Sequence, residues 1–362
     1  MKIATNCKHG KPVKRCLLIK TSSLGDIIHT LPALTDACRA TGGIRFDWVV
    51  EEAFSEIPAW HQAVRTVIPI AFRRWRRQIP HTIYSGAWQK FRTQLQHHHY
   101  DMVIDAQGLL KSAWIARLAR GTTYGPDRKS AREPLAAWFY HHKTAVPTHM
   151  HAVERNRLFL AKIFGYEVPG TVDYGIDAFF PACEKRDETI LFFHGTTWET
   201  KLWPDSYWLR LADQLTFDGY AIALPWGNET EKKRAEHIRL SVRHPDQVSV
   251  LPRLSLRDMA CRIRQAAGVV AVDSGLAHLA AAMNTPVVSI FGPTQPGLTR
   301  PYGLNQICLQ VGTSCQGCLR KRCGKSAPAD GLAQEQITSV CYQTVPPEKV
   351  KNALYSLIHP RR

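Results

Sequence analysis

Two aspartates follow apolar segments in the same way, one near each end of the chain. Asp26 follows the apolar run 16–19 and a small-residue turn, and Asp273 follows the apolar run 268–272 and opens Asp-Ser-Gly. This order predicts a buried strand, a tight turn and then a helix. Backbone N–H groups at such a helix start suit a phosphate. Asp26 could alternatively do no more than cap its helix, but the repeated arrangement favours a functional role.

A second candidate for chemistry is a basic segment, residues 72–77, in which four arginines alternate with Phe72 and Trp75. The arginines of such a cluster can form paired hydrogen bonds with carboxylates or phosphates, and Trp75 would then lie at an apolar or interfacial surface. A solvated charged face explains the run equally well. Nucleic acid would also suit it, but no zinc-finger, RNA-binding or helix-turn-helix signature accompanies it.

Cysteines supply a third candidate. Cys315, Cys318 and Cys323 have the spacing C-x₂-C-x₄-C, and Cys341 lies downstream. Four thiolates could hold a structural zinc ion, or two of the cysteines could pair, so the spacing is a partial metal-site signal. The consecutive histidines 97–99 cannot share one helical face, and they indicate a polar helix end rather than a metal site.

Composition limits the class of protein. The 362 residues, 44% hydrophobic and 21% charged, fit a globular enzyme of two domains. The net charge of +17 indicates an anionic partner such as nucleic acid, anionic lipid or a phosphorylated substrate. No apolar run approaches a transmembrane span or a signal-peptide core. We therefore expect a cytoplasmic protein that can rest on a membrane surface.

Strands and helices alternate through both halves. The predicted strands are 16–19, 46–50, 67–70, 102–105, 189–193, 220–224, 248–251, 268–272 and 287–291. This alternation predicts an α/β protein with two doubly wound parallel sheets, each binding ligands beyond the carboxyl ends of its strands. The predicted parts are a basic extension (1–15), two Rossmann-like domains (16–180 and 181–345) and a final helix (346–362). Facing domains would form a cleft, with Asp26 on one wall and Asp273 on the other.

Several longer motifs together resemble the bacterial lipopolysaccharide heptosyltransferases of glycosyltransferase family 9. The opening segment, 20–37, is similar to the start of these enzymes. The segments that match the heptosyltransferase I group, or continue the resemblance, are 46–52, 105–113, 131–136, 151–155, 201–204, 224–227, 272–279 and 292–298. The resemblance extends from Cys16 to about Gly303. The extension before Cys16 and the region after Gly312 depart from the family pattern.

The resemblance implies a GT-B fold, with the acceptor mainly on the N-terminal domain and the donor mainly on the C-terminal one. It implies inverting transfer of L-glycero-D-manno-heptose from ADP-heptose to Kdo of the lipopolysaccharide inner core, without a catalytic metal or another cofactor. Kdo-lipid A and the anionic inner-membrane surface become the expected partners, in place of nucleic acid. The expected location is the cytoplasmic face of the inner membrane.

The resemblance also assigns roles to individual residues. Asp26 matches the proposed general base, and Lys201 matches a residue that stabilises the leaving diphosphate. The other donor-side matches are Thr196, Thr197, Glu231 (ribose), Leu254 (adenine), Asp273, Ser274, Gly275 and His278. The basic residues that match the acceptor side are Arg73, Arg74, Arg76, Lys111 and Arg132. A carboxylate beside a diphosphate is unfavourable, so Asp273 is expected to bind sugar hydroxyls.

Two other functions stay open at this point. One is a transferase of the same fold with another substrate, such as heptosyltransferase II or an enzyme using a different ADP-sugar. The other is a non-enzymatic basic protein that binds an anionic surface. The sequence does not distinguish one Kdo, two Kdo or a phosphorylated Kdo as the acceptor.

Overall fold

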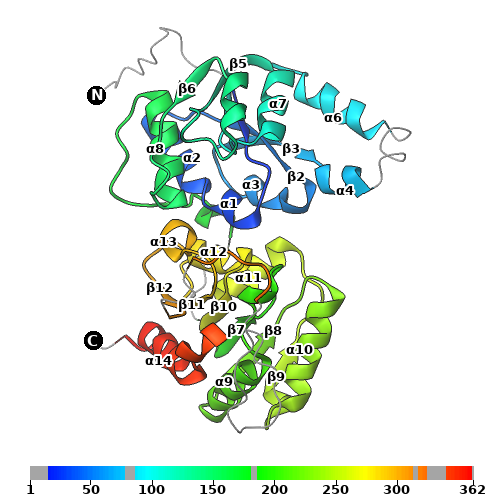
Figure 1. Ribbon diagram of the computed structural model, residues 1–362, viewed down its shortest axis with the longest axis vertical. Helices are drawn as coiled ribbons and strands as arrows, with labels where there is room; N and C mark the ends of the chain where they lie inside the picture. The colour runs from blue at the N-terminus through cyan, green and yellow to red at the C-terminus, as the bar shows by residue number, and fades with distance from the viewer. Residues whose placement is uncertain (1–14, 78–85, 181–185, 313–316, 324–339, 361–362) are drawn as a thin grey trace. The chain divides into compact units, whose positions relative to one another are not determined.

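The computed structural model describes residues 15–77, 86–180, 186–312, 317–323 and 340–360 (Figure 1). The chain divides into two compact units, Met1–Pro181 (unit 1) and Ala182–Arg362 (unit 2). The described residues of each unit form one six-stranded sheet whose neighbouring strands are all parallel. Parallel sheets need helices on both faces, because the crossover connections run there.

The sheet of unit 1 has the strand order β3-β2-β1-β4-β5-β6. Its strands are β1 (Cys16–Ile19), β2 (Phe46–Glu51), β3 (Val64–Ile70), β4 (His99–Asp105), β5 (Arg120–Pro126) and β6 (His142–Thr144). The order reverses direction between β1 and β4. In open α/β sheets this switch point leaves a crevice beyond the strand ends.

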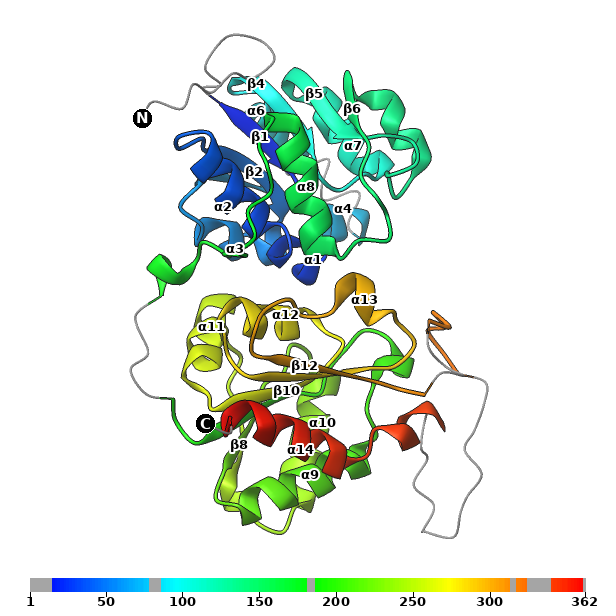
Figure 2. The same ribbon diagram turned by 90° about the vertical axis from the view of Figure 1, so that its left-hand side faces the viewer.

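Helices cover both faces of this sheet. They are α1 (Leu24–Ile28), α2 (Leu31–Ala40), η1 (Glu52–Phe54), α3 (Glu56–Ala59), α4 (Phe72–Arg77), α6 (Ala87–Leu95), α7 (Leu110–Leu118), η2 (Pro134–Phe139), α8 (Ala152–Phe164) and η3 (Asp177–Phe179). Helices α2 and α8 lie side by side on one face (Figure 2). On the other face, Phe91 and Leu95 of α6 and Ile115 of α7 pack against Leu17 and Ile19 of β1.

Unit 2 repeats the design. Its sheet has the order β12-β11-β10-β7-β8-β9, which again reverses between its first and fourth strands, β7 and β10. The strands are β7 (Thr189–Phe193), β8 (Ala221–Leu224), β9 (Val248–Val250), β10 (Gly268–Val272), β11 (Val287–Phe291) and β12 (Gln306–Gln310). Turns that follow β7 and β10 therefore meet at the switch point of this sheet.

The helices of unit 2 pack in the same manner. They are η4 (Glu199–Lys201), α9 (Asp205–Phe217), α10 (Glu229–Ser241), η5 (Pro245–Gln247), α11 (Leu256–Gln265), α12 (Gly275–Ala282), α13 (Pro296–Thr299), η7 (Val340–Thr344) and α14 (Pro347–Ile358). Helices α9, α10 and α14 cover one face, and α11 and α12 the other (Figure 2). Trp203, Trp208 and Tyr342 are fully buried and fill the core beneath α9 and α14.

The structure corrects three sequence expectations. The helix expected after the first turn is two helices, α1 and α2, with Pro32 in the first turn of α2, where a missing N–H costs least. The histidines 97–99 were expected to form a polar helix end, but His99 is already the first residue of β4 and pairs with Arg120 of β5. Strands β5, β6 and β12 were not predicted. Within the described part of the chain, no helix is long and apolar enough to cross a bilayer.

Candidate active site

Asp26 lies just beyond β1, at the switch point of unit 1. Its Oδ2 accepts the backbone N–H of Ser23 at 2.9 Å and the Ser23 hydroxyl at 3.2 Å, so it does cap helix α1. Its Oδ1 accepts a hydrogen bond of 2.6 Å from Nη2 of Arg132. The capping interpretation and the functional interpretation of this residue are therefore compatible, because each uses a different carboxylate oxygen.

Lys20, the last residue before this turn, is almost fully buried and interacts electrostatically with Asp26. Its ammonium group donates to the carbonyl of Ala106 at 2.8 Å. Burial lowers the pKa of Lys20 to about 8, although nearby Asp26 opposes the shift. Burial would raise the pKa of Asp26, but the positive charges of Lys20 and Arg132 outweigh it and hold that pKa well below its usual range. Asp26 is thus a carboxylate at any working pH.

A buried carboxylate, Asp105, organises the neighbouring turn after β4. Its Oδ1 accepts the backbone N–H groups of Gln107 and Gly108 at 2.8 and 3.2 Å. Its Oδ2 accepts the hydroxyls of Ser112 and Tyr140 at 2.8 and 2.6 Å. Burial raises the pKa of Asp105 against the effect of these hydrogen bonds. Four donors on one buried carboxyl fix the turn in one conformation.

The two turns of unit 1 are joined through Gln107. Its side-chain oxygen accepts the backbone N–H groups of Thr21 and Ser22 at 3.1 and 3.4 Å. The Asp105 turn therefore holds the segment that carries Lys20 and Asp26. Sequence reasoning missed the roles of Lys20, Asp105 and Gln107, although all three stand in the segments that carried the resemblance. The available signal was a polar residue at the end of a buried strand.

In unit 2, Lys201 and Asp273 form an ion pair of 2.7 Å beyond the strand ends. The Thr294 hydroxyl donates to the same Asp273 oxygen at 2.6 Å, and the Thr196 hydroxyl donates to the Asp273 carbonyl at 3.3 Å. The ammonium of Lys201 also lies 4.7 Å from the centre of the Trp198 ring. The predicted donor residues Thr196, Lys201 and Asp273 are thus brought together at the switch point between β7 and β10.

Helix α12 begins directly after Asp273, with Ser274 as its N-cap and Gly275 as its first residue. The Ser274 hydroxyl is buried and has no hydrogen-bond partner among the described residues. The first backbone N–H groups of a helix also lack partners within the helix. Together with Lys201 these groups suit a phosphate. His278 is buried one turn further along α12.

Glu231 lies in the first turn of α10, beside the loop after β7 that carries Gly195 and Thr196. Its carboxylate accepts the Gly227 N–H at 2.7 Å. A Cβ on Gly195 would come within 2.5 Å of the Glu231 carboxyl carbon, so a larger residue at position 195 would require the Glu231 side chain to shift. A cavity of about 730 Å³ borders Gly195, Thr196 and Glu231. Leu254 is half-buried in the loop after β9, and Thr197 is exposed.

The predicted acceptor-side residues fall into three groups in unit 1. Arg73, Arg76 and Lys111 line one cavity. Arg132 pairs with Asp26 instead. Arg74 is not brought to either place, because its exposed guanidinium pairs with Glu52 at 2.9 Å. The helical turn of α4 separates these arginines, since adjacent residues on a helix point in different directions.

Trp75 lies at an apolar surface, one of the two environments that the sequence suggested for it. Its ring is half-buried and packs against Phe72, Trp88 and Phe91 at centroid distances of 6.0, 5.9 and 5.9 Å. Aromatic rings at these distances stabilise one another by edge-to-face contact. The aromatic residues of this segment therefore form part of a cavity wall.

The cysteine site stays a prediction. Cys315 lies outside the described residues, Cys318 and Cys323 are exposed, and Cys341 is half-buried. Among the residues that the structure describes, no group of three or more His, Cys, Asp or Glu side chains is arranged to hold a metal ion. The expectation that Asp26 and Asp273 lie on opposite walls of one cleft also stays a prediction.

Comparison with known proteins gives a consistent result. The chain is 47% identical to lipopolysaccharide heptosyltransferase 1 of Pseudomonas aeruginosa over 352 residues, which cover 95% of this chain and 98% of that protein. It is also 47% identical to the Escherichia coli K12 protein of the same name over 297 residues, 81% of this chain and 92% of that one.

Solved structures agree. The E. coli heptosyltransferase WaaC with ADP matches with a TM-score of 0.78 at 46% identity, covering 82% of this chain and 93% of that one. E. coli ADP-heptose lps heptosyltransferase II, at 18% identity, has a TM-score of 0.70 over 95% of this chain and 98% of that one, and shows the fold alone. The predicted GT-B fold is confirmed. The family model of glycosyltransferase family 9 (heptosyltransferase) matches residues 88–327, and with these relatives it establishes that the chain is a glycosyltransferase of that family.

Proposed function

We propose that this enzyme transfers L-glycero-D-manno-heptose from ADP-heptose to Kdo of the lipopolysaccharide inner core, with inversion at the anomeric carbon. The observation that carries the proposal is the pair of equivalent switch points. One holds an ionised carboxylate between two cations, and the other holds a lysine, hydroxyls and a helix start suited to phosphate. The names of the relatives reported above support the same reaction.

In this proposal Asp26 acts as general base on the acceptor hydroxyl. The hydroxyl oxygen forms the new bond to the anomeric carbon, the bond to the ADP oxygen breaks, and the hydroxyl proton passes to Asp26. A carboxylate with a lowered pKa is a weak base, but the hydroxyl becomes acidic as its oxygen bonds to carbon. The carboxylate of Kdo can draw Arg132 away from Asp26, which would make Asp26 more basic when the acceptor is bound.

On the donor side, Lys201 supplies charge to the diphosphate as ADP leaves. The ion pair with Asp273 holds the ammonium in place before the donor binds. The Thr196 and Ser274 hydroxyls and the first N–H groups of α12 add donors around the same point. Asp273 is left to accept from sugar hydroxyls, and Glu231 from the ribose.

We propose Kdo-lipid A as acceptor and the cytoplasmic face of the inner membrane as the place of reaction. The net charge of +17 favours an anionic surface. The cationic side chains Arg73, Arg76 and Lys111 of unit 1 suit the carboxylate and phosphates of the acceptor. We expect no role for nucleic acid.

We further propose that turnover needs no divalent metal, because Lys201 and the helix start already supply positive potential to the diphosphate. Full activity after treatment with EDTA is the expected result. Activity that returned only with added Mg²⁺ or Mn²⁺ would contradict this part of the proposal.

The test is ADP release by the purified enzyme with ADP-heptose and Kdo-lipid A, followed by mass analysis of the product. One added heptose on Kdo is the expected result. Transfer only to an acceptor that already carries heptose would indicate heptosyltransferase II activity, and turnover only with another ADP-sugar would indicate a different donor. Binding without any turnover would overturn the proposal.

A further inference from the structure

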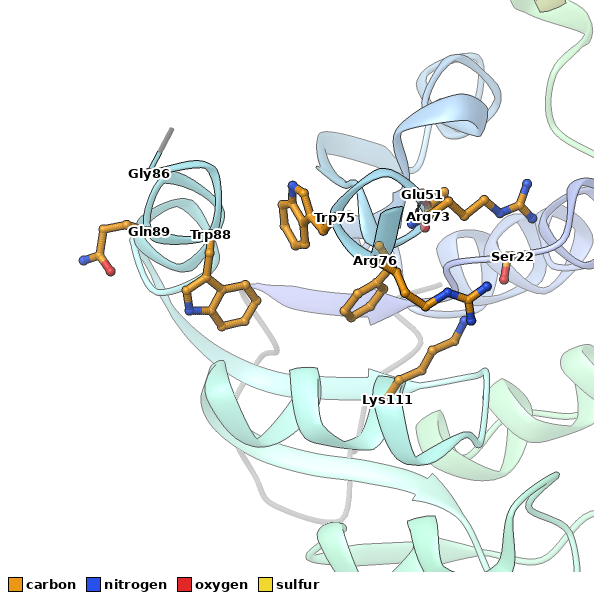
Figure 3. A pocket seen from close by; sticks show the side chains of 10 residues that line it. Ser22, Glu51, Arg73, Trp75, Arg76, Gly86, Trp88, Gln89 and Lys111 are labelled. Atoms are coloured by element: carbon orange, nitrogen blue, oxygen red, sulfur yellow. Dashed lines mark hydrogen bonds between the residues drawn. The ribbon is translucent and has the colours of Figure 1, made fainter. Parts of the chain in front are cut away.

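Unit 1 contains a cavity that is apolar at one end and cationic at the other. It lies between helices α4, α6 and α7 and has a volume of about 790 Å³. Phe72, Trp75 and Trp88 line its apolar part, and Arg73, Arg76 and Lys111 line its cationic part (Figure 3). Figure 3 shows the two tryptophans on the side away from Ser22, whereas the head groups of Arg76 and Lys111 extend toward Ser22.

The aromatic wall continues to the protein surface. Trp75 meets Trp88 edge to face at 5.9 Å, and Trp88 stacks on Trp114 of α7 at 5.1 Å with an interplanar angle of 14°. Trp114 is 43% exposed, and Leu110 one turn earlier is 39% exposed. These two exposed apolar side chains extend the aromatic lining of the cavity onto the protein surface.

The cationic end of the cavity carries three positive side chains, and Arg73 and Lys111 interact electrostatically with Glu51, the acidic residue beside them. None of the ion pairs between described residues involves Arg76 or Lys111. The Lys111 ammonium lies 5.8 Å from the centre of the Phe72 ring, and the Arg73 guanidinium 5.0 Å from that of Phe54. The one acidic lining residue, Glu51, accepts the backbone N–H of Arg73 at 3.0 Å. This end of the cavity therefore suits an anion.

We propose that this cavity binds a hydrocarbon chain of the lipid acceptor, with the acceptor's anionic sugar at Arg76 and Lys111 and the chain along Trp75 and Trp88. The inference rests on the proposed function, and it adds an acyl-chain site to the sugar and phosphate contacts. A sugar alone would leave the aromatic end unfilled. An anionic amphiphile complements both ends, because its charge and its chain are joined in the same order as the two linings.

The test compares two acceptors, Kdo-lipid A with all its acyl chains and the same molecule after complete deacylation. We expect the wild-type KM to be at least tenfold lower for the acylated acceptor, since burying several methylene groups is favourable. Trp88→Ser should raise the KM for the acylated acceptor at least tenfold more than the KM for the deacylated one. Trp88→Phe should restore most of the difference.

Trp138→Ser is the matched control, because Trp138 is 72% exposed on η2 and does not line the cavity. It should leave the ratio of the two KM values at the wild-type level. Equal KM values for both acceptors in the wild type, or equal effects of Trp88→Ser on both, would overturn the inference while transfer continues. Absence of transfer to either acceptor would instead overturn the proposed function.

Thermal melting of each variant shows whether the substitution has disturbed the fold. A direct measurement is independent of turnover: dodecyl phosphate with a brominated chain should quench tryptophan fluorescence in the wild type and less in Trp88→Phe. Quenching that is identical in both proteins would contradict the placement of the chain. Single-stranded DNA and dodecyl phosphate can also be compared as inhibitors of transfer to the acylated acceptor. If single-stranded DNA competes with this acceptor more strongly than dodecyl phosphate does, the cavity binds stacked nucleotides and the inference is overturned.

Discussion

At the scale of single residues, the site depends on how each charged group is paired. Asp26 uses one oxygen to cap α1 and the other to bind Arg132, and the buried Lys20 adds a second positive charge nearby. In unit 2, Asp273 pairs with Lys201. Both acidic groups are held by cations before any substrate arrives, so substitution of a cation should change the carboxylate as well as the ligand.

Asp26→Asn should lower kcat by roughly 10²–10⁴, as for loss of a general base, with ADP-heptose affinity retained. The amide can still accept the Ser23 N–H, so the cap is largely preserved. Ser23→Ala is the control: it removes one hydroxyl from Asp26 but keeps the carboxylate, and its kcat should stay close to wild type. Near wild-type turnover by Asp26→Asn, with calorimetry showing normal donor binding, would place the base elsewhere.

Arg132→Met should raise the pKa of Asp26 toward its usual value, because one of two neighbouring cations is removed. A lowered carboxyl pKa means that activity is kept as pH falls until the lowered pKa is reached. In the variant, the acidic limb of kcat/KM should therefore move to higher pH. Initial rates from pH 3 to 7 with the deacylated acceptor measure this shift, and loss of activity at the same pH in wild type and variant would contradict the coupling between Arg132 and Asp26.

Lys201→Ala should weaken ADP binding tenfold or more and lower turnover, since a charge-assisted contact to the diphosphate is lost. Lys321→Ala is a matched control. Its ammonium lies 5.6 Å from the centre of the same Trp198 ring, but Lys321 is exposed and makes no described ion pair with Asp273. Calorimetry with ADP measures both. Equal ADP dissociation constants for wild type and Lys201→Ala would contradict the placement of the diphosphate.

At the scale of elements, the turn between β4 and α7 positions the turn between β1 and α1. Asp105 binds four donors within its own turn and from Tyr140, and Gln107 then binds the backbone of Thr21 and Ser22. The α4 helix determines where its arginines point. Because successive side chains of a helix face different directions, Arg76 lines the cavity whereas Arg74 pairs with Glu52.

Asp105→Ala should destabilise the protein by about 3 kcal/mol or more, because it leaves several buried donors without an acceptor. Tyr140→Phe removes one of these hydrogen bonds and should cost about 1 kcal/mol. Both should lower kcat in the same order, while ADP affinity stays unchanged because the donor residues belong to unit 2. The measurements are thermal melting and initial rates. A fully stable Asp105→Ala with normal kcat would show that the turn does not depend on this carboxyl.

At the scale of the whole molecule, the excess of positive charge should make the enzyme sensitive to salt. Replacing Arg73, Arg76 and Lys111 together by Ala should raise the acceptor KM markedly and reduce its dependence on ionic strength, while ADP affinity is retained. Arg74→Ala is the control, because that side chain pairs with Glu52 on the outside. Initial rates at two ionic strengths measure both. If the acceptor KM and its dependence on ionic strength are unchanged in the triple variant, these three side chains are solvated charges that do not bind the acceptor.

The sequence by itself determined the alternation of strands and helices, the parallel sheets and the position of Asp26 and Asp273 in turns at strand ends. These features depend on local patterns: an apolar run of strand length, a turn of small residues and a helical repeat. Strand β7 was predicted at its observed bounds for this reason. The short or partly exposed strands β5, β6 and β12 carry a weak pattern, and they were missed.

Only the tertiary structure decided which distant residues meet. Gln107 reaches Thr21 across 86 residues of chain because the strand order places β4 beside β1, and Arg132 reaches Asp26 across 106 because it follows β5, the next strand of the same sheet. Folding likewise separated Arg74 from Arg76 and gathered Trp75 with Trp88. The physical reason is that a side chain's direction and charge depend on the packing of its element and on the groups that burial brings near it, and neither is a local property of the sequence.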